Sequence, residues 1–200
     1  GCNNIAIGNC ALKCNTTASR NTAVGFVSMC MNTTGVNTAV GAYSLFKNTT
    51  GNNNTASGYY ALGTNVTGNN NTGHGHYALG FNSTGCYNTA VGYRSLYANT
   101  TACYNTAFGA DTLKANTTGK FNVANGYGAL YVNTTATRNT AIGYLTLSSN
   151  TTGDKNIAIG MTAMESNTTG GCNTAVGTCA LQANTTASGN TAIGKYGLYA

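Results

Sequence analysis

Apolar and polar positions recur along this chain with a fixed period, which is plain in the stretch from Asn88 to Phe121. Residues 88–104 read NTAVGYRSLYANTTACY, and residues 105–121 read NTAFGADTLKANTTGKF. Placing the first Asn of each stretch in register divides the chain into twelve units. Each step is 17 residues, except the step from Asn21 to Asn37, which is 16. We expect a single repeat array over residues 1–200 that is a segment of a longer fibre.

Some positions of the unit hardly vary. Counting the first Asn as position zero, position two is Ala in all units but one, and position four is always Gly. Position one is Thr, Ile or Val, position seven is small, and position eight is Leu or Met. Positions eleven and thirteen are Asn and Thr in every unit that contains them. All nine Lys and Arg, all three acids and all thirteen Tyr occupy other, variable positions. We therefore expect the fixed positions to face a core or a turn, and the variable ones to face solvent.

This pattern predicts strands and turns. Asn, Thr and Gly are weak helix formers and recur every few residues, whereas short β-branched runs broken by Asn and Gly are typical of strands and turns. A unit that repeats with little change buries its apolar face by stacking on the next unit, about 4.8 Å away. The sequence predicts an all-β fold, a parallel β-solenoid (β-roll or β-helix) with one 17-residue repeat per coil.

Stacking places each fixed Asn above its equivalent, so that side-chain amides can form ladders. Position zero precedes the expected strand and is predicted to form an internal structural ladder. Its members are Asn21, Asn37, Asn54, Asn71, Asn88, Asn105, Asn122, Asn139, Asn156, Asn173 and Asn190.

Position eleven follows a variable window and is predicted to lie nearer the surface. Its Asn-x-Thr pattern is that of an N-glycosylation acceptor, and also that of an Asx-turn followed by a Thr ladder. The candidate glycosylation residues are Asn15, Asn32, Asn48, Asn65, Asn82, Asn99, Asn116, Asn133, Asn150, Asn167 and Asn184.

The composition limits the classes of partner that the chain is expected to bind. Only 6% of residues are charged, against about 25% in an ordinary soluble domain. The net charge of +6 comes from scattered bases, whereas a nucleic-acid surface requires clustered ones. No apolar run approaches the roughly 18 residues of a membrane span. We expect no nucleic-acid partner and no membrane insertion in this segment.

Catalytic patterns are not found. Asp111, Asp154 and Glu165 occupy three different positions of the unit and are predicted to be solvated, which argues against a carboxylate pair. The two histidines share one unit that contains no acid to orient them, which argues against a Ser-His-Asp triad. We expect no enzymatic activity and no cofactor.

Two pairs of residues are candidates for cross-links. His74 and His76 are two apart, so a strand would place them on one face, where imidazoles could bind a transition metal in an oligomer. The alternative is two ordinary surface histidines. Cys86 and Cys103 share position fifteen of adjacent units, and stacking would bring their Cα atoms to about 5 Å, within the disulfide range. Most of the other cysteines have no such neighbour and are expected to be free.

The unit NTAIGYLTLSSNTTGDK, residues 139–155, resembles the head repeats of trimeric autotransporter adhesins. It is also similar to repeats of bacteriophage tail-fibre proteins and of tail-fibre-like bacterial surface proteins. The resemblance implies a left-handed roll, a homotrimer or end-to-end fibre, and an extracellular location at a cell surface or on a virion. Under this resemblance, the small residues at positions two and four would allow a second backbone to approach closely.

The expected function is the structural shaft of an extracellular fibre, which provides length and rigidity and carries glycans if position eleven is modified. One alternative is a carbohydrate-binding adhesin surface, in which Tyr clusters such as Tyr127 and Tyr131 contact glycans. A second is an ice-binding solenoid, which requires both Thr columns to face outward on one flat face. A third is a functional amyloid-like filament. The expected partners are copies of the chain itself and glycans.

Overall fold

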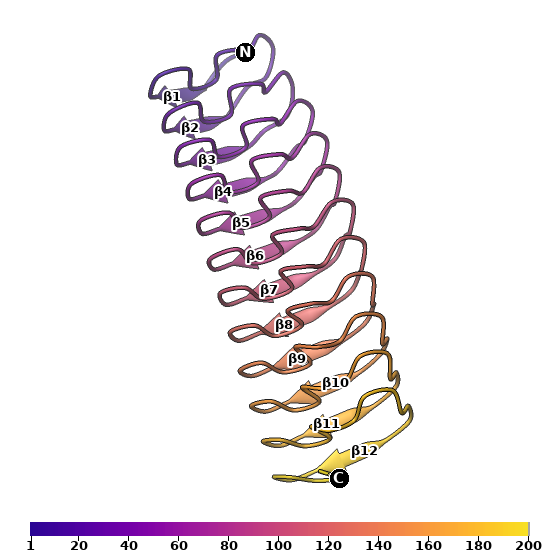
Figure 1. The fold of residues 1–200 in the computed structure, drawn as a ribbon. Coiled ribbons are helices and arrows are strands. Elements are labelled where there is room, and N and C mark those ends of the chain that lie inside the picture. Colours follow the sequence, from indigo (N-terminus) through magenta and orange to yellow (C-terminus); the bar gives the residue numbers. More distant parts are fainter. Residues whose placement is uncertain (200) are drawn as a thin grey trace.

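The structure, a computed structural model, describes residues 1–199 as an all-β parallel solenoid with one repeat per coil, as the period predicts. Figure 1 shows the coils stacked along one axis, with the two termini at opposite ends. Each coil contributes one three-residue strand to a single sheet. The strands are β1 (Ile5–Ile7), β2 (Thr22–Val24), β3 (Thr38–Val40), β4 (Thr55–Ser57), β5 (Thr72–His74), β6 (Thr89–Val91), β7 (Thr106–Phe108), β8 (Val123–Asn125), β9 (Thr140–Ile142), β10 (Ile157–Ile159), β11 (Thr174–Val176) and β12 (Thr191–Ile193).

The sheet has the strand order β1 to β12, and every neighbouring pair is parallel. Equivalent positions pair with one another, so that Ala141 of β9 lies opposite Ala158 of β10. Side chains alternate across a strand: position two points into the coil, where Ala141 is fully buried, and positions one and three point outward. The outer face of the sheet, defined as positions one and three of β1–β12, contains no Lys, Arg, Asp or Glu.

Backbone hydrogen bonds between coils continue beyond the short strands. In the coil of residues 88–104, Leu96 N donates to Thr112 O of the following coil at 3.0 Å, and Thr100 N donates to Thr117 O at 3.1 Å. Tyr104 N donates in the other direction, to Cys86 O of the preceding coil at 3.1 Å. The backbone polar groups are thus paired at several points around the coil.

Position four contains Gly because two constraints meet there. Gly92 has a φ of +128°, which strains side-chain-bearing residues, and a Cβ on it would lie 2.5 Å from Gly109 O in the next coil. The resemblance implied that small residues at positions two and four admit another chain. Here position two faces the core, and the backbone that approaches position four is the next coil of the same chain.

Position eight forms the buried apolar column. Leu96 is fully buried and has a φ of +48°. The φ values of the equivalent residues lie within a few degrees of this value. A side chain branched at Cβ is poorly tolerated in this conformation, which suits a column of Leu and Met. Leu198 is the exception to the predicted burial: it is 57% exposed, because it lies in the last coil that the structure describes. The predicted column comprises Leu12, Leu45, Leu62, Leu79, Leu96, Leu113, Leu130, Leu147, Leu181 and Leu198.

Candidate functional site

The position-eleven Asn residues are buried, which corrects the prediction that this column lies nearer the surface. Asn99 is 0% exposed. Its Nδ2 donates to Asn82 Oδ1 at 2.7 Å, and its Oδ1 accepts from Asn116 Nδ2 at 3.2 Å. The same rung repeats between consecutive coils from Asn32 to Asn184. We call this chain of amides the position-eleven ladder.

The physical reason is a tight turn. Asn99 N donates to Leu96 O at 3.2 Å, and this bond returns the chain toward the coil interior directly after the variable window. Asn99 Nδ2 also donates to Ala102 O at 3.2 Å, so the nitrogen that a glycan would occupy already has two acceptors. Of the candidate glycosylation residues, Asn15 and Asn184, the first and last of the column, are partly exposed and the others are buried.

The two Thr columns that follow this ladder differ in exposure. At position twelve, Thr100 is half-buried and its Oγ1 donates to Thr117 O of the next coil at 3.2 Å. At position thirteen, Thr101 and its equivalents are exposed. These two columns therefore do not present a shared outward array of hydroxyls, which the ice-binding alternative requires.

Position zero forms a second internal ladder of a different kind. Asn88 N donates to Asn71 Oδ1 at 3.0 Å, so each side chain accepts from the backbone of the next coil. Asn88 Nδ2 donates to Ala102 O at 2.8 Å. Ala102 O also accepts from Asn99 Nδ2. One position-fourteen carbonyl thereby links both ladders within a coil, and this explains why both Asn positions are fixed.

The 16-residue unit interrupts this arrangement. In the described residues, Asn32 Nδ2 and Asn15 Oδ1 are buried without hydrogen-bond partners. Gly35, at position fourteen of this unit, has a φ of +98°, and Asn21 Nδ2 donates instead to Ser19 O at 3.2 Å. Omitting one residue thus displaces the carbonyl that links the two ladders in the other coils.

Position fifteen forms a third ladder that the sequence did not predict. Cys86 N donates to Cys103 Sγ at 3.1 Å, and Asn69 N donates to Cys86 Sγ at 3.2 Å. Asn52 N makes the equivalent bond to Asn69 Oδ1 at 2.8 Å. Cys86 and Cys103 are neighbours, as their shared position predicts, but both are free thiols in the structure. The column was missed because its residues vary, although many of them share a side-chain acceptor.

His74 and His76 belong to different surfaces. His74 ends β5 and is exposed on the outer face. Gly75 then turns the chain with a φ of +132°, so the two-residue alternation of a strand does not extend to His76. The His76 ring lies 5.2 Å from that of Tyr59 and 5.6 Å from that of Tyr93. Within residues 1–199, no three His, Cys, Asp or Glu side chains are grouped to hold a metal ion.

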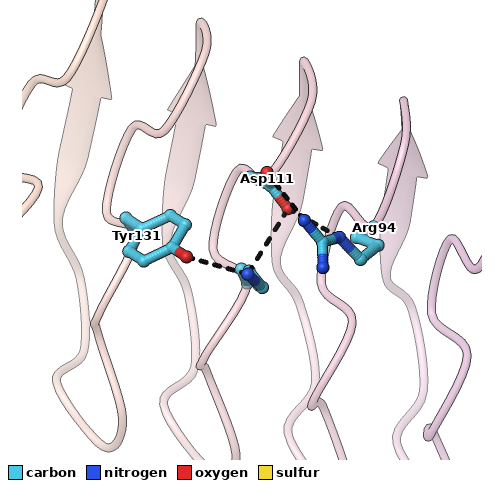
Figure 2. Close-up of polar contacts among 4 residues, drawn as sticks. Arg94, Asp111 and Tyr131 are labelled. Atoms are coloured by element: carbon cyan, nitrogen blue, oxygen red, sulfur yellow. Dashed lines mark hydrogen bonds and ion pairs between the residues drawn. The ribbon is translucent and has the colours of Figure 1, made fainter.

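Asp111 is ion-paired and 7% exposed, which corrects the prediction that it is solvated. Its Oδ1 lies 3.0 Å from Arg94 Nε and 3.8 Å from Lys114 Nζ, and Arg94 Nη2 donates to its Oδ2 at 3.3 Å. Lys114 Nζ also donates to the Tyr131 hydroxyl at 2.8 Å. Figure 2 shows Arg94, Asp111 and Tyr131, which come from three successive coils. Burial acts to lower the pKa of Arg94, but the charge and hydrogen bond of Asp111, together with Tyr93 and Tyr131, outweigh it, so the pKa is raised.

Aromatic rings pack on the wall formed by positions five, six, nine and ten, which we call the aromatic wall. Tyr77, at position six, lies 5.8 Å from the ring of Tyr97 at position nine. Phe81, at position ten, is 4.8 Å from Tyr97. Burial, followed by the neighbouring Tyr59 hydroxyl, raises the pKa of Tyr77. Rings at position six thus pack against rings at positions nine and ten in the coils of residues 71–104.

Further along the aromatic wall, the rings leave a hollow that is open to solvent. A hollow of about 410 Å³ lies between the loops of the coils that contain β8 and β9. It is lined by Tyr127, Tyr131, Val132, Tyr144, Leu145, Ser148 and Ser149. We call it the tyrosine hollow. It contains one of the Tyr pairs, Tyr127 and Tyr131, that the sequence suggested for glycan contact.

Comparison of the chain with protein-family models, with curated proteins and with solved structures finds no match in any of the three. No helix long and apolar enough to cross a membrane occurs in the part of the chain that the structure describes. The candidate functions therefore depend on the geometry of the solenoid and of its surfaces.

Proposed function

We propose that this chain forms part of the shaft of an extracellular fibre, at a cell surface or on a virion, and that it provides length and rigidity. The observation that carries the proposal is the repetition of one set of contacts at successive coil-to-coil steps. At the step from residues 88–104 to residues 105–121, these contacts are the position-zero bond, the position-eleven rung, the buried Leu column and the backbone bonds.

The same contacts support rigidity. Bending the rod would separate two neighbouring coils on one side, which breaks several hydrogen bonds at once. Each neutral bond contributes about 1 kcal/mol net. A loop would require the loss of many such bonds before it became accessible to a protease. Resistance to bending and to proteolysis suits a load-bearing spacer.

The proposed partner is a copy of the same chain, associated laterally as a homotrimer or joined end to end. Lateral association is supported by the outer face of the sheet, which contains no Lys, Arg, Asp or Glu over twelve strands. Ile142, Ile157 and Ile159 are each more than a third exposed there. The face extends over about 53 Å for strands spaced by about 4.8 Å. It is uncharged and mixes Thr with apolar residues, and burial of the apolar ones, such as Ile142, Ile157 and Ile159, gains free energy.

Electron microscopy of the purified chain, with a mass measurement by light scattering, tests this proposal. We expect straight rods whose mass is a multiple of 20.3 kDa. Ile142→Lys, on the outer face, should reduce the mass to that of one chain, whereas Thr135→Lys, on the exposed position-thirteen column, should leave it unchanged. Flexible or globular particles would refute the shaft, and a monomeric wild type would refute lateral association.

A further inference from the structure

The tyrosine hollow exists because two positions lack the rings found elsewhere on the aromatic wall. Position six is Tyr in several units, including Tyr60 and Tyr77, but it is Gly128 in the unit that contains β8. Position nine, which is Tyr97 in the unit that contains β6, is Ser148 in the unit that contains β9. The smaller residues Gly128 and Ser148 leave a hollow where rings at these positions would otherwise pack.

The lining of the hollow combines flat apolar surfaces with hydroxyl groups. Tyr127 and Tyr144 stack with their ring centroids 5.7 Å apart and an interplanar angle of 15°, and each is 51% exposed. Leu145 adds apolar surface, whereas Ser148 and Ser149 add hydroxyls. None of the lining residues is charged. The ligand that matches such a lining is uncharged and has both an apolar face and a polar edge.

The Tyr131 hydroxyl has a defined role in this arrangement. Lys114 Nζ donates to its oxygen at 2.8 Å, so the hydroxyl accepts from the ammonium group and keeps its own proton for a ligand. Lys114 is in turn held near Asp111, 3.8 Å from its Oδ1. The ion cluster therefore orients a hydrogen-bond donor at the edge of the hollow without placing a charge among the lining residues.

We propose that the tyrosine hollow is a binding site for a neutral sugar ring. A pyranose presents C–H groups on one face, which pack against an aromatic ring, and hydroxyls around its edge, which bond to Tyr and Ser hydroxyls. The volume of 410 Å³ lies within the range of roughly 300–1,000 Å³ that small-molecule sites occupy. This binding activity adds to the shaft function and does not depend on it.

The affinity of one such site is low, because the hollow is open to solvent and its hydrogen bonds compete with water. We expect a dissociation constant of about 1 mM for a single sugar. Copies of the chain held side by side in a fibre would raise the effective affinity for a polysaccharide, because the second binding event becomes intramolecular.

Saturation-transfer NMR with the intact chain tests the proposal, using glucose, galactose, mannose and N-acetylglucosamine as separate probes. We expect a saturable signal from at least one sugar. Tyr144→Ala should weaken it at least tenfold, whereas Tyr144→Phe should retain most of it because the stacking ring remains. Tyr104→Ala is the matched control, because Tyr104 is also 51% exposed and stacked, 5.0 Å from Tyr87 on another column. Sugar binding by the Tyr104→Ala variant should equal that of the wild type.

Gly128→Tyr provides an independent test by filling the hollow. Tyr60 and Tyr77 adopt φ values of +55° and +59° at the equivalent position, close to the +62° of Gly128. A Cβ on Gly128 would meet Leu145 Cδ2 at 2.7 Å, which is the movable end of a side chain. We expect this variant to keep the β-sheet circular dichroism spectrum and to lose sugar binding. Absence of a signal from all four sugars, or equal binding by wild type and Gly128→Tyr, would overturn the proposal and leave the shaft function untouched.

Discussion

Replacing Asn99 by Ala should destabilise the rod strongly although no apolar core residue changes. The substitution removes three hydrogen bonds, to Asn82 Oδ1, to Ala102 O and from Asn116 Nδ2. At about 1 kcal/mol net for each neutral bond, this loss is about 3 kcal/mol. Ala102 O retains Asn88 Nδ2, but Asn82 Oδ1 is left buried without its amide donor. An unsatisfied buried acceptor costs a further 1–2 kcal/mol or so. We therefore expect a loss of about 4–5 kcal/mol in the free energy of unfolding.

The assay is urea denaturation followed by circular dichroism, at equal protein concentrations. Asn125→Ala is the matched control, because Asn125 is exposed on the outer face, and it should change the free energy by no more than about 0.5 kcal/mol. Asn99→Asp should be at least as harmful as Asn99→Ala at neutral pH. A carboxylate cannot donate, and it would lie where Nδ2 now meets Asn82 Oδ1 at 2.7 Å. Equal stability of the Asn99→Ala and Asn125→Ala variants would refute the reasoning that the ladder stabilises the fold.

Three further changes test other columns. Leu96→Asp should prevent assembly, because burying an unpaired carboxylate costs several kcal/mol, whereas Tyr97→Ser on the aromatic wall should preserve the β-sheet spectrum; similar tolerance of both would show that the two columns are misassigned. Gly92→Ala should destabilise strongly because its φ is +128°. Gly85→Ala should cost less than Gly92→Ala, because Gly85 has no positive φ and position fourteen already contains Ala in units such as that of residues 88–104. It should still cost something, since a Cβ on Gly85 would clash with Ala102 O unless the turn shifts. A reversed order in thermal unfolding would contradict this. Burial and the neighbouring thiols Cys14 and Cys10 raise the pKa of Cys30. The folded state therefore holds this proton more tightly, and Cys30 contributes stability that is present below its unfolded pKa and lost as pH rises through the folded value. We expect Cys30 to alkylate more slowly than the exposed cysteines at pH 8, as measured by peptide mass spectrometry, and faster alkylation would contradict the burial.

The repeat pattern predicted the fold because each coil faces an almost identical coil. A column that is Leu or Met in every unit, such as position eight, must lie inside when the same contact recurs at every step. Absence of charge alone was not sufficient, because positions one and thirteen are also uncharged and their residues are largely exposed. The same reasoning placed Ala at position two inside the sheet. This inference of burial from sequence failed at position eleven. The fixed Asn follows a variable window, and its closeness in sequence to surface residues wrongly suggested that it lies near the surface. The turn from Leu96 to Asn99 reverses the chain within three residues, and its geometry depends on the left-handed backbone of Leu96, which the sequence does not reveal.

The candidate site was less predictable, because it results from departures from the repeat. Asp111 is buried since Arg94 occupies the same column one coil earlier and Lys114 approaches from position nine. Neither contact can be recognised from the fixed positions of the unit. The tyrosine hollow likewise depends on Gly128 and Ser148 in columns that contain Tyr in other units. Comparing each variable residue with its equivalent one coil earlier identifies the pairing of Arg94 with Asp111.

The position-eleven ladder gives the rod a direction. In every rung from Asn32 to Asn184, the amide nitrogen belongs to the later coil and the oxygen to the earlier one. The amide dipoles consequently point the same way and add along the axis, and each bond polarises the next. Within this ladder, one face of any coil offers amide donors and the opposite face offers acceptors. Joining two rods by like faces would set ladder donor against ladder donor, so this ladder favours head-to-tail extension. A filament assembled this way is polar, with two distinguishable ends, and a structure attached to the filament tip would lie at one of them.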